Sequence, residues 1–425
     1  MTVEQIIQDS IKDFKEMQAK QRRMHVRKML DYYCGSNTPQ YIEQYFDADA
    51  FREIPCYEAN FTKRFINKMS RIYTVGAAYN VSNQYDSLIR MKAARMKHIE
   101  RMTRLLGTVA TQVVYIDGDN PHFDYRPIYY FDVHLGENPF HPEAIMYPIL
   151  GNVDDISYAE KMRFAYFDKS IYAEYDEDGN IIDEYEHGYG VLPFMFTHRE
   201  NQLDSFFVDG ADDIVSCNEQ VNITMTELQL GLRFQMFGQP YITGLQADKR
   251  LERAGSDTIL DLPEGSVFDI VAPEADLQSV IETVKFQVDL VAQNNHLYVQ
   301  FAQDGGEVPS GIALKIKDLE RFEDYQDDLE LWKMYEHDLY KVEREIAEYN
   351  GIRLPQELKI DFNEPEYPKS IQDQIMWDNH RLQNNLITQA KLMLEYNDDL
   401  SLQEAESIVN NNKSVNQELQ NENRR

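Results

Sequence analysis

Cysteine is scarce in this chain, with three residues of this type among 425. Cys34, Cys56 and Cys217 are far apart and odd in number, so neither a CxxC metal knuckle nor a disulfide framework is available. We expect each of them to be a buried, inert thiol of a protein that folds in a reducing cytoplasm.

Long apolar runs are also absent. The longest uninterrupted stretches, such as residues 191–196, have the length of a strand and fall far short of the roughly 20 residues that a membrane span needs. The N-terminus, MTVEQIIQDSIKDFKEM, is amphipathic and acidic and lacks the basic start and apolar block of a signal peptide. We therefore expect a soluble protein that has no membrane partner and stays in the compartment that made it.

The usual catalytic fingerprints are missing as well. The sequence contains no GxxxxGK[ST] or GxGxxG phosphate cradle, no GxSxG elbow and no HExxH zinc motif. His122, His134 and His141 come nearest to a cluster, but their spacing does not suit a metal, and we expect no cofactor. The string DEDGN at residues 176–180 lacks two ligand positions of a calcium loop, so it predicts a hairpin turn.

Positive charge is scarce, and it is unevenly placed. The formal net charge is −31, from 42 Lys and Arg against 73 Asp and Glu. Residues 1–110 carry 18 basic against 12 acidic residues, which leaves 24 against 61 for the rest of the chain. Such an acidic body cannot hold phosphates over a broad surface, because non-specific DNA binding depends on cationic contacts and counterion release.

The periodicity of apolar residues predicts an α+β protein that is mainly helical. Short β-branched and aromatic runs between residues 108 and 198 are typical of an antiparallel sheet. The segment from 312 to 350 keeps a three/four spacing and would form a rod of about 57 Å. Helices are predicted over residues 1–35, 60–73, 86–106, 212–237, 276–299, 312–350 and much of 370–425, and an α+β insert over 241–273.

Three strings resemble the portal protein, or head-to-tail connector, of tailed double-stranded DNA phages. PSGIALK at residues 309–315 follows a Gly/Pro loop at the start of the long helix, GVLPFMFTHRE at 190–200 closes the β-rich part, and DDIVSCNEQVN at 212–222 opens an acidic helix. The resemblance extends from about residue 60 to residue 351 and lies in element order more than in a catalytic fingerprint.

The resemblance implies the portal architecture of wing, stem, clip and crown. Residues 1–210 would be wing, 211–238 a stem helix, 239–275 the clip, 276–299 the second stem helix, 300–311 the tunnel loop, 312–369 the long wing helix and its connection, and 370–425 the crown and C-terminal tail.

The resemblance also implies functional residues, none of them catalytic and none a metal ligand. The DNA-facing tunnel loop would comprise Gln303, Asp304, Gly305, Gly306, Glu307, Val308, Pro309 and Ser310. This loop has no Lys or Arg, so the nearest candidate phosphate contacts are Lys315 and Lys317, which are equally suited to be ordinary helix-surface charges. Docking of the motor and adaptors would fall to the clip residues Asp248, Lys249, Arg250 and Arg253.

The implied function is that of a non-enzymatic subunit of a ring, usually a dodecamer, at the portal vertex of the virion. Double-stranded DNA would pass through the channel during packaging and ejection. The implied partners are other copies of the chain, the large terminase ATPase, head-completion and tail adaptor proteins, and the major capsid and scaffolding proteins, with assembly in the host cytoplasm. Two alternatives stay open: another virion assembly component, such as an adaptor or minor capsid protein, and an intracellular enzyme with an unrecognised site.

Overall fold

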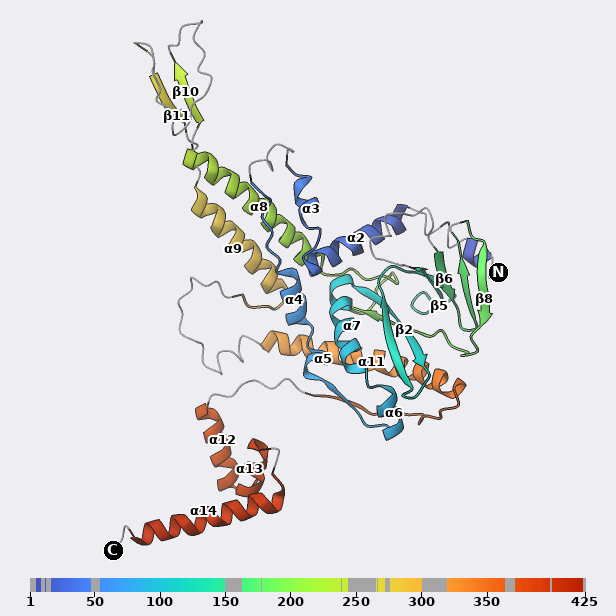
Figure 1. The fold of residues 1–425 in the computed structure, drawn as a ribbon, viewed down its shortest axis with the longest axis vertical. Coiled ribbons are helices and arrows are strands. Elements are labelled where there is room, and N and C mark those ends of the chain that lie inside the picture. Colours follow the sequence, from blue (N-terminus) through green and yellow to red (C-terminus); the bar gives the residue numbers. More distant parts are fainter. Residues whose placement is uncertain are drawn as a thin grey trace. The chain divides into compact units, whose positions relative to one another are not determined.

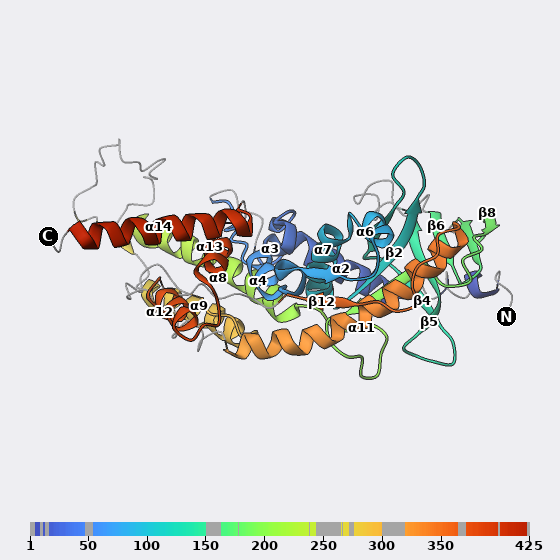
Figure 2. The same cartoon turned by 90° about the horizontal axis from the view of Figure 1, so that it is seen from below.

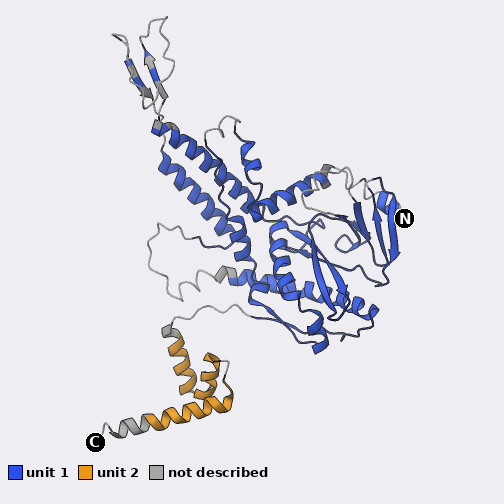
Figure 3. Cartoon of the chain, in the orientation of Figure 1, with its two compact units in different colours: residues 1–301, 320–364 blue, residues 302–319, 365–425 orange. Residues whose placement is uncertain are grey.

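The computed structural model divides the chain into two compact units (Figure 3). Unit 1 comprises residues 1–301 and 320–364, and unit 2 comprises residues 302–319 and 365–425. The structure describes residues 5–8, 12, 17–46, 54–149, 163–176, 178–237, 239–243, 265, 267–271, 276–299, 319–363, 371–397 and 400–422.

Short helices form the first part of unit 1, and two of the predicted helices are interrupted. Residues 60–73 form α4 (Thr62–Met69) and α5 (Ile72–Val75), and residues 86–106 form α6 (Asn83–Leu88) and α7 (Lys92–Leu106). The break before α5 is stabilised by the buried Glu100 of α7, whose carboxylate accepts the N–H groups of Ile72 and Tyr73 at 2.8 and 3.0 Å. The earlier helices are α2 (Met17–Cys34) and α3 (Pro39–Glu43).

A three-stranded antiparallel sheet packs against α7. Strand β2 (Thr108–Ile116) lies in the centre and pairs with β3 (His122–Ile128) and β9 (Phe194–His198). Gly107 joins α7 to β2 at a φ of +81°, and a Cβ there would lie 1.9 Å from the carbonyl oxygen of Val208. Only glycine allows this sharp turn from helix to strand.

The second sheet is an antiparallel meander of five strands, as the run of short apolar segments predicts. It comprises β4 (Asp132–Leu135), β5 (Pro142–Ile149), β6 (Arg163–Phe167), β7 (Ile171–Tyr175) and β8 (Ile181–Glu186). The hairpin predicted at residues 176–180 is confirmed: the Asp176 carboxylate accepts the N–H groups of Asp178 and Asn180, and β7 pairs with β8.

The predicted long helices are present within the described residues, but the helix predicted over residues 276–299 ends at Asn294, because the chain turns at His296 with a φ of +49°. Helix α8 (Asp212–Phe237) and helix α9 (Leu277–Asn294) lie side by side and are joined through the antiparallel ladder of β10 (Gln239–Thr243) and β11 (Val267–Val271) (Figure 1). Helix α11 (Leu319–Tyr349) runs along unit 1, and in Figure 2 it lies at one side of it. Strand β12 (Ile360–Phe362) pairs with β1 (Ala77–Tyr79).

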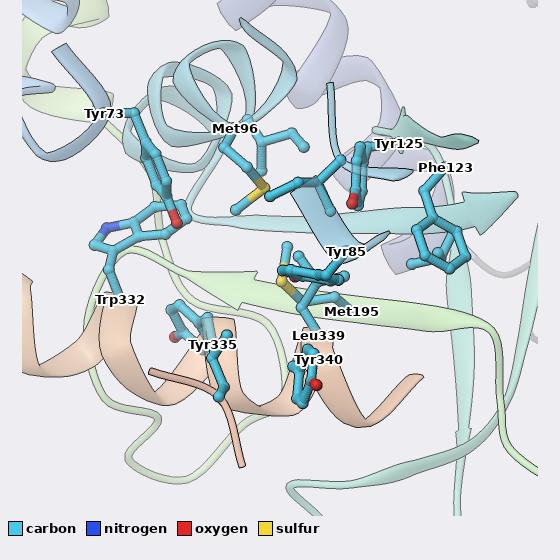
Figure 4. Packing of buried hydrophobic residues seen from close by; sticks show 14 of the residues in the cluster. Tyr73, Tyr85, Met96, Phe123, Tyr125, Met195, Trp332, Tyr335, Leu339 and Tyr340 are labelled. Atoms are coloured by element: carbon cyan, nitrogen blue, oxygen red, sulfur yellow. The ribbon is translucent and has the colours of Figure 1, made fainter. Parts of the chain in front are cut away.

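The largest core of unit 1 joins α11 to the three-stranded sheet (Figure 4). Trp332, Tyr335 and Leu339 of α11 are buried in it, and the ring of Trp332 meets the ring of Tyr73 edge-on at 5.3 Å. An edge-on pair of aromatic rings stabilises the fold by about 1 kcal/mol beyond the contribution of the surface that it buries. The apolar stripe predicted on this helix is therefore covered within the same chain along these turns.

Unit 2 contains the helices α12 (Ile371–Gln383), α13 (Gln389–Tyr396) and α14 (Leu402–Glu422). Arg381 of α12 binds Glu395 of α13 with two hydrogen bonds of 2.7 and 2.6 Å. Thr388 caps α13 by accepting the N–H of Lys391. The helical prediction for this region is thus confirmed where the structure describes it.

The structure tests the predicted burial of the three cysteines and the expected lack of membrane-spanning helices. Cys217 is buried as expected and Cys56 is half-buried, but Cys34 is exposed because it is the last residue of α2, so the prediction of a buried thiol was wrong there. Among the described helices, none combines the length and the hydropathy of a membrane span.

Candidate functional site

The residues predicted to face DNA or to dock partners lie outside the described part of the chain. The structure describes the elements beside them: α9 and the residues up to Val299 before the loop, α11 from Leu319 after it, and the β10–β11 ladder next to the clip residues. The predictions for Gln303–Ser310, Lys315, Lys317, Asp248, Lys249, Arg250 and Arg253 therefore stay predictions.

The base of the α8–α9 pair, where the first half of α8 meets the second half of α9, is held by side-chain hydrogen bonds. Cys217 of α8 donates to the carbonyl of Gln287 at 3.8 Å, and Asn295 donates to Asp213 at 2.6 Å. These contacts join the first half of α8 to the last half of α9, so the helices run antiparallel. Val221 and Val288 belong to the same buried cluster.

Helix α2 anchors the base of this pair through charges. Lys28 binds Glu219 at 2.7 Å, and the imidazole of His25 lies 2.5 Å from the carboxylate of Asp212 at the start of α8. The hydrogen bond to Asp212 raises the pKa of His25 and lowers that of Asp212. A carboxylate in the first turn of α8 also interacts favourably with the helix dipole.

Large apolar side chains are exposed at two places on the pair, near the end of α8 and in the second half of α9. Met236 is 72% exposed and Phe286 is 66% exposed, and Leu232 and Leu290 are 44% and 46% exposed. Covering apolar surface in water stabilises by about 25 cal/mol per Å², so uncovered side chains of this kind favour association. The helix pair thus has a held base and two exposed apolar places, which no described residue of this chain covers.

A column of polar side chains on α8 holds residues 57–62, the segment that leads into the first residue of α4. Asn222 accepts the N–H of Ala59 at 2.8 Å and donates to its carbonyl at 3.1 Å. One turn earlier Asn218 accepts the N–H of Phe61, and one turn later Thr226 accepts the N–H of Tyr57. Since 218, 222 and 226 are four apart, they share one helix face and replace a strand partner for this segment.

A buried charge cluster fastens α11 to α7. The ammonium of Lys92 lies 2.8 Å from Glu336 and 3.0 Å from Glu343, and all three side chains are fully buried. Burial alone lowers the pKa of Lys92, but the two carboxylates outweigh it and the net pKa is raised. Burial raises the pKa of Glu343.

Four tyrosine hydroxyl groups complete this cluster. Tyr73 and Tyr79 donate to Glu336 at 2.5 and 2.7 Å, and Tyr85 and Tyr125 donate to Glu343 at 2.6 and 2.5 Å. Burial and the neighbouring carboxylates hold the pKa of each phenol well above 10, so the phenols stay donors. The cluster fills the space between its elements, which makes it a fastening of α11 and leaves no opening for a substrate.

Sequence reasoning missed this cluster and the column on α8. Lys92 belongs to a helix with many basic residues, and the chain has 73 acids, so the sequence singles out none of the three. A usable signal exists on α11: Glu336 and Glu343 are seven residues apart and fall among the apolar positions 332, 339 and 346. Acids within an apolar stripe indicate buried charge that needs a partner.

Neither a metal site among the described residues nor a match to a known protein points to a function. Within the residues that the structure describes, no group of His, Cys, Asp and Glu is arranged to hold a metal ion. No protein-family model matches this chain, and no curated protein matches its sequence.

Proposed function

We propose that this chain is the subunit of a portal ring, through which double-stranded DNA enters and leaves a phage capsid. The observation that carries the proposal is the α8–α9 pair, an antiparallel pair of 26- and 18-residue helices that exposes Met236 and Phe286 and is linked by a small β ladder. Long helices with an uncovered apolar side are suited to pack around an axis with sister copies.

The order of the elements supports the same proposal. A β-rich part and short helices precede the pair, and α11 and a separate helical unit follow it. In portal terms, α8 and α9 would be the stem, β10 and β11 would belong to the clip, α11 to the wing and unit 2 to the crown. The loop before α11 would then point into the channel.

The acidic character of the chain suits a conduit for DNA. With a net charge of −31, the surface repels phosphates and offers few cationic contacts. A channel of this kind lets DNA slide instead of holding it, while a separate terminase ATPase supplies the force. The proposed location is the portal vertex of the virion, where the ring would also meet adaptor, capsid and scaffolding proteins.

Electron microscopy of the purified chain tests the proposal. We expect annular particles whose central hole is wide enough for duplex DNA, roughly 20 Å or more. Particles without such a hole would favour an adaptor or minor capsid protein. A chain that stays strictly monomeric at micromolar concentration contradicts the proposal.

A further inference from the structure

The outer faces of α4 and α7 carry cations and no exposed acid. Helix α4 contains Lys63, Arg64 and Lys68 and no acidic residue. The single acid of α7 is Glu100, which is 2% exposed. Phe65 of α4 and Met102 of α7 are buried in one core cluster, so the apolar sides of the two helices face inward. We call the cations on this surface the basic face: Lys63, Arg64, Lys68, Lys97 and Arg101.

The contacts show that these cations lie close to one another. Tyr33 of α2 donates to Asn67 at 2.9 Å, and its ring lies 5.6 Å from the ammonium of Lys63. Arg101 is hydrogen-bonded to the same tyrosine. An open hollow between Asn60 and Lys68 is lined also by Lys63, Arg64 and Asn67.

Four cations of the basic face are not paired with a described carboxylate. In the described part of the chain, no carboxylate lies within ion-pair distance of Lys63, Arg64, Lys97 or Arg101. The pKa of His98 on α7 is lowered mainly by burial, and the positive charges of Arg95 and Arg101 lower it further. Uncompensated charges of one sign raise the local potential and attract a partner of the other sign.

The first half of α11 carries the opposite surface. Glu323, Asp327 and Glu330 are exposed and spaced by four and three, so they share one helix face. Glu323 and Asp327 have no cation within ion-pair distance among the described residues, and Glu330 binds only Lys333 of its own helix. Tyr325 and Trp332 point into the core on the other side. We call these three acids the acidic face.

We propose that the basic face of one copy of this chain binds the acidic face of the next copy, head to tail. This inference rests on the proposed ring function and names the contact that joins neighbouring subunits. Each face repels a copy of itself, so a two-fold contact between identical faces is disfavoured. Two different, complementary patches are what a closed ring requires.

The sizes of the two faces fit this pairing. On α11 the first and last of the three acids are seven positions apart, or about 10 Å along the axis, and on α4 the first and last cations are five positions apart, or about 8 Å. DNA is a less suitable occupant, because the net charge of −31 repels it at long range while a sister chain supplies acids in the matching arrangement. Such charge pairs at an interface act chiefly on specificity and register.

Reciprocal charge reversal tests the contact. One variant carries K63E, R64E and K68E, and the other carries E323K, D327K and E330K. The control K169E, R353E and K359E shifts the net charge of the chain as much as the first variant does, at residues exposed elsewhere on unit 1. Circular dichroism and thermal melting verify folding, and native mass spectrometry with sedimentation velocity measures assembly in full-length protein.

Each reversed variant alone should assemble at least about tenfold less well than wild type at low salt, because like charges then meet at the contact. A 1:1 mixture should restore assembly, in particles that contain equal numbers of the two variants, since each reversed face then meets its complement. The control should assemble as wild type does.

The outcomes separate this inference from the proposed function. Annular wild-type particles together with unimpaired assembly of both variants overturn the contact and leave the ring intact. If wild type forms particles without a central hole, and the two variants assemble only when they are mixed, the ring is contradicted and the contact is supported. A strictly monomeric wild type contradicts both. If the first variant assembles normally but loses retention of a 30-base-pair DNA duplex, the basic face binds nucleic acid and the inference is wrong.

Discussion

Removing the positive charge of Lys92 is expected to destabilise the fold, because of the groups that surround it. Among the described residues, its ammonium is the one cation within ion-pair distance of the buried Glu336 and Glu343, to which the surrounding phenols donate neutral hydrogen bonds. A buried carboxylate that keeps its hydrogen bonds but loses its counterion bears most of its desolvation penalty. The three charges therefore act as one unit.

We expect Lys92→Met to lower the free energy of unfolding by about 3–5 kcal/mol, because it leaves two buried acids without a cation. Urea denaturation followed by circular dichroism measures this. Lys97→Met, at a half-exposed position of the same helix, should change it by less than about 0.5 kcal/mol. Equal effects of the two substitutions would show that the Lys92 cluster does not stabilise the packing of α11 on α7.

Glu100 makes stability depend on pH. Burial raises its pKa to about 7, although two backbone N–H groups donate to it. The folded chain then binds this proton more tightly than the unfolded chain, so its contribution to stability is full below pH 4.5 and falls as pH rises through about 7. A shift of this size corresponds to roughly 3 kcal/mol.

The substitution Glu100→Gln should remove this part of the pH dependence. Urea midpoints measured between pH 4.5 and pH 8 should fall less steeply for the variant than for wild type. Other groups titrate in both proteins, so the difference between the two curves is the quantity to compare. Parallel curves would contradict the raised pKa of Glu100.

At the scale of elements, the column on α8 explains why residues 57–62 are ordered without a strand partner. Asn222 is fully buried and satisfies both polar backbone groups of Ala59. Removing it takes away the acceptor of the Ala59 N–H, while the Ala59 carbonyl still accepts from Asn218 at 2.7 Å, so the cost is about 1–2 kcal/mol.

We expect Asn222→Ala to lower stability by that amount and to speed amide hydrogen exchange over residues 57–62. Gln220→Ala, at an exposed position on another face of α8, should have neither effect. Hydrogen exchange with mass spectrometry reads out the segment itself. Unchanged exchange in the Asn222 variant would mean that the segment is held by other contacts.

The elements that the sequence predicted well are those whose signal is local. Helix α8 and strand β2 have the bounds that periodicity and composition indicated. The breaks after Met69 and Leu88 were missed, because the first depends on the carboxylate of Glu100 about 28 residues away. The burial of Lys92 was missed for the same reason, since its partner Glu343 is 251 residues distant. No window of a single sequence contains such a pair.

For the whole molecule, the exposed apolar side chains in the second half of α9 set the expectation. If sister copies cover Phe286 and Leu290, a charge at these positions would be buried without a partner in the assembly, but it would be harmless in a lone chain because both side chains are exposed. Association and folding can therefore be separated by experiment.

The double substitution F286E/L290E should leave the melting temperature of the lone chain nearly unchanged and shift sedimentation toward smaller species, with assembly weakened by about 100-fold or more. Leu203→Glu and Ile182→Glu provide the matched control, since Leu203 is 86% exposed and Ile182 is 51% exposed, both away from the helix pair. The control should assemble as wild type does. If the double variant assembles equally well, the helices are not covered by sister copies at these positions, and the central packing argument for a ring fails.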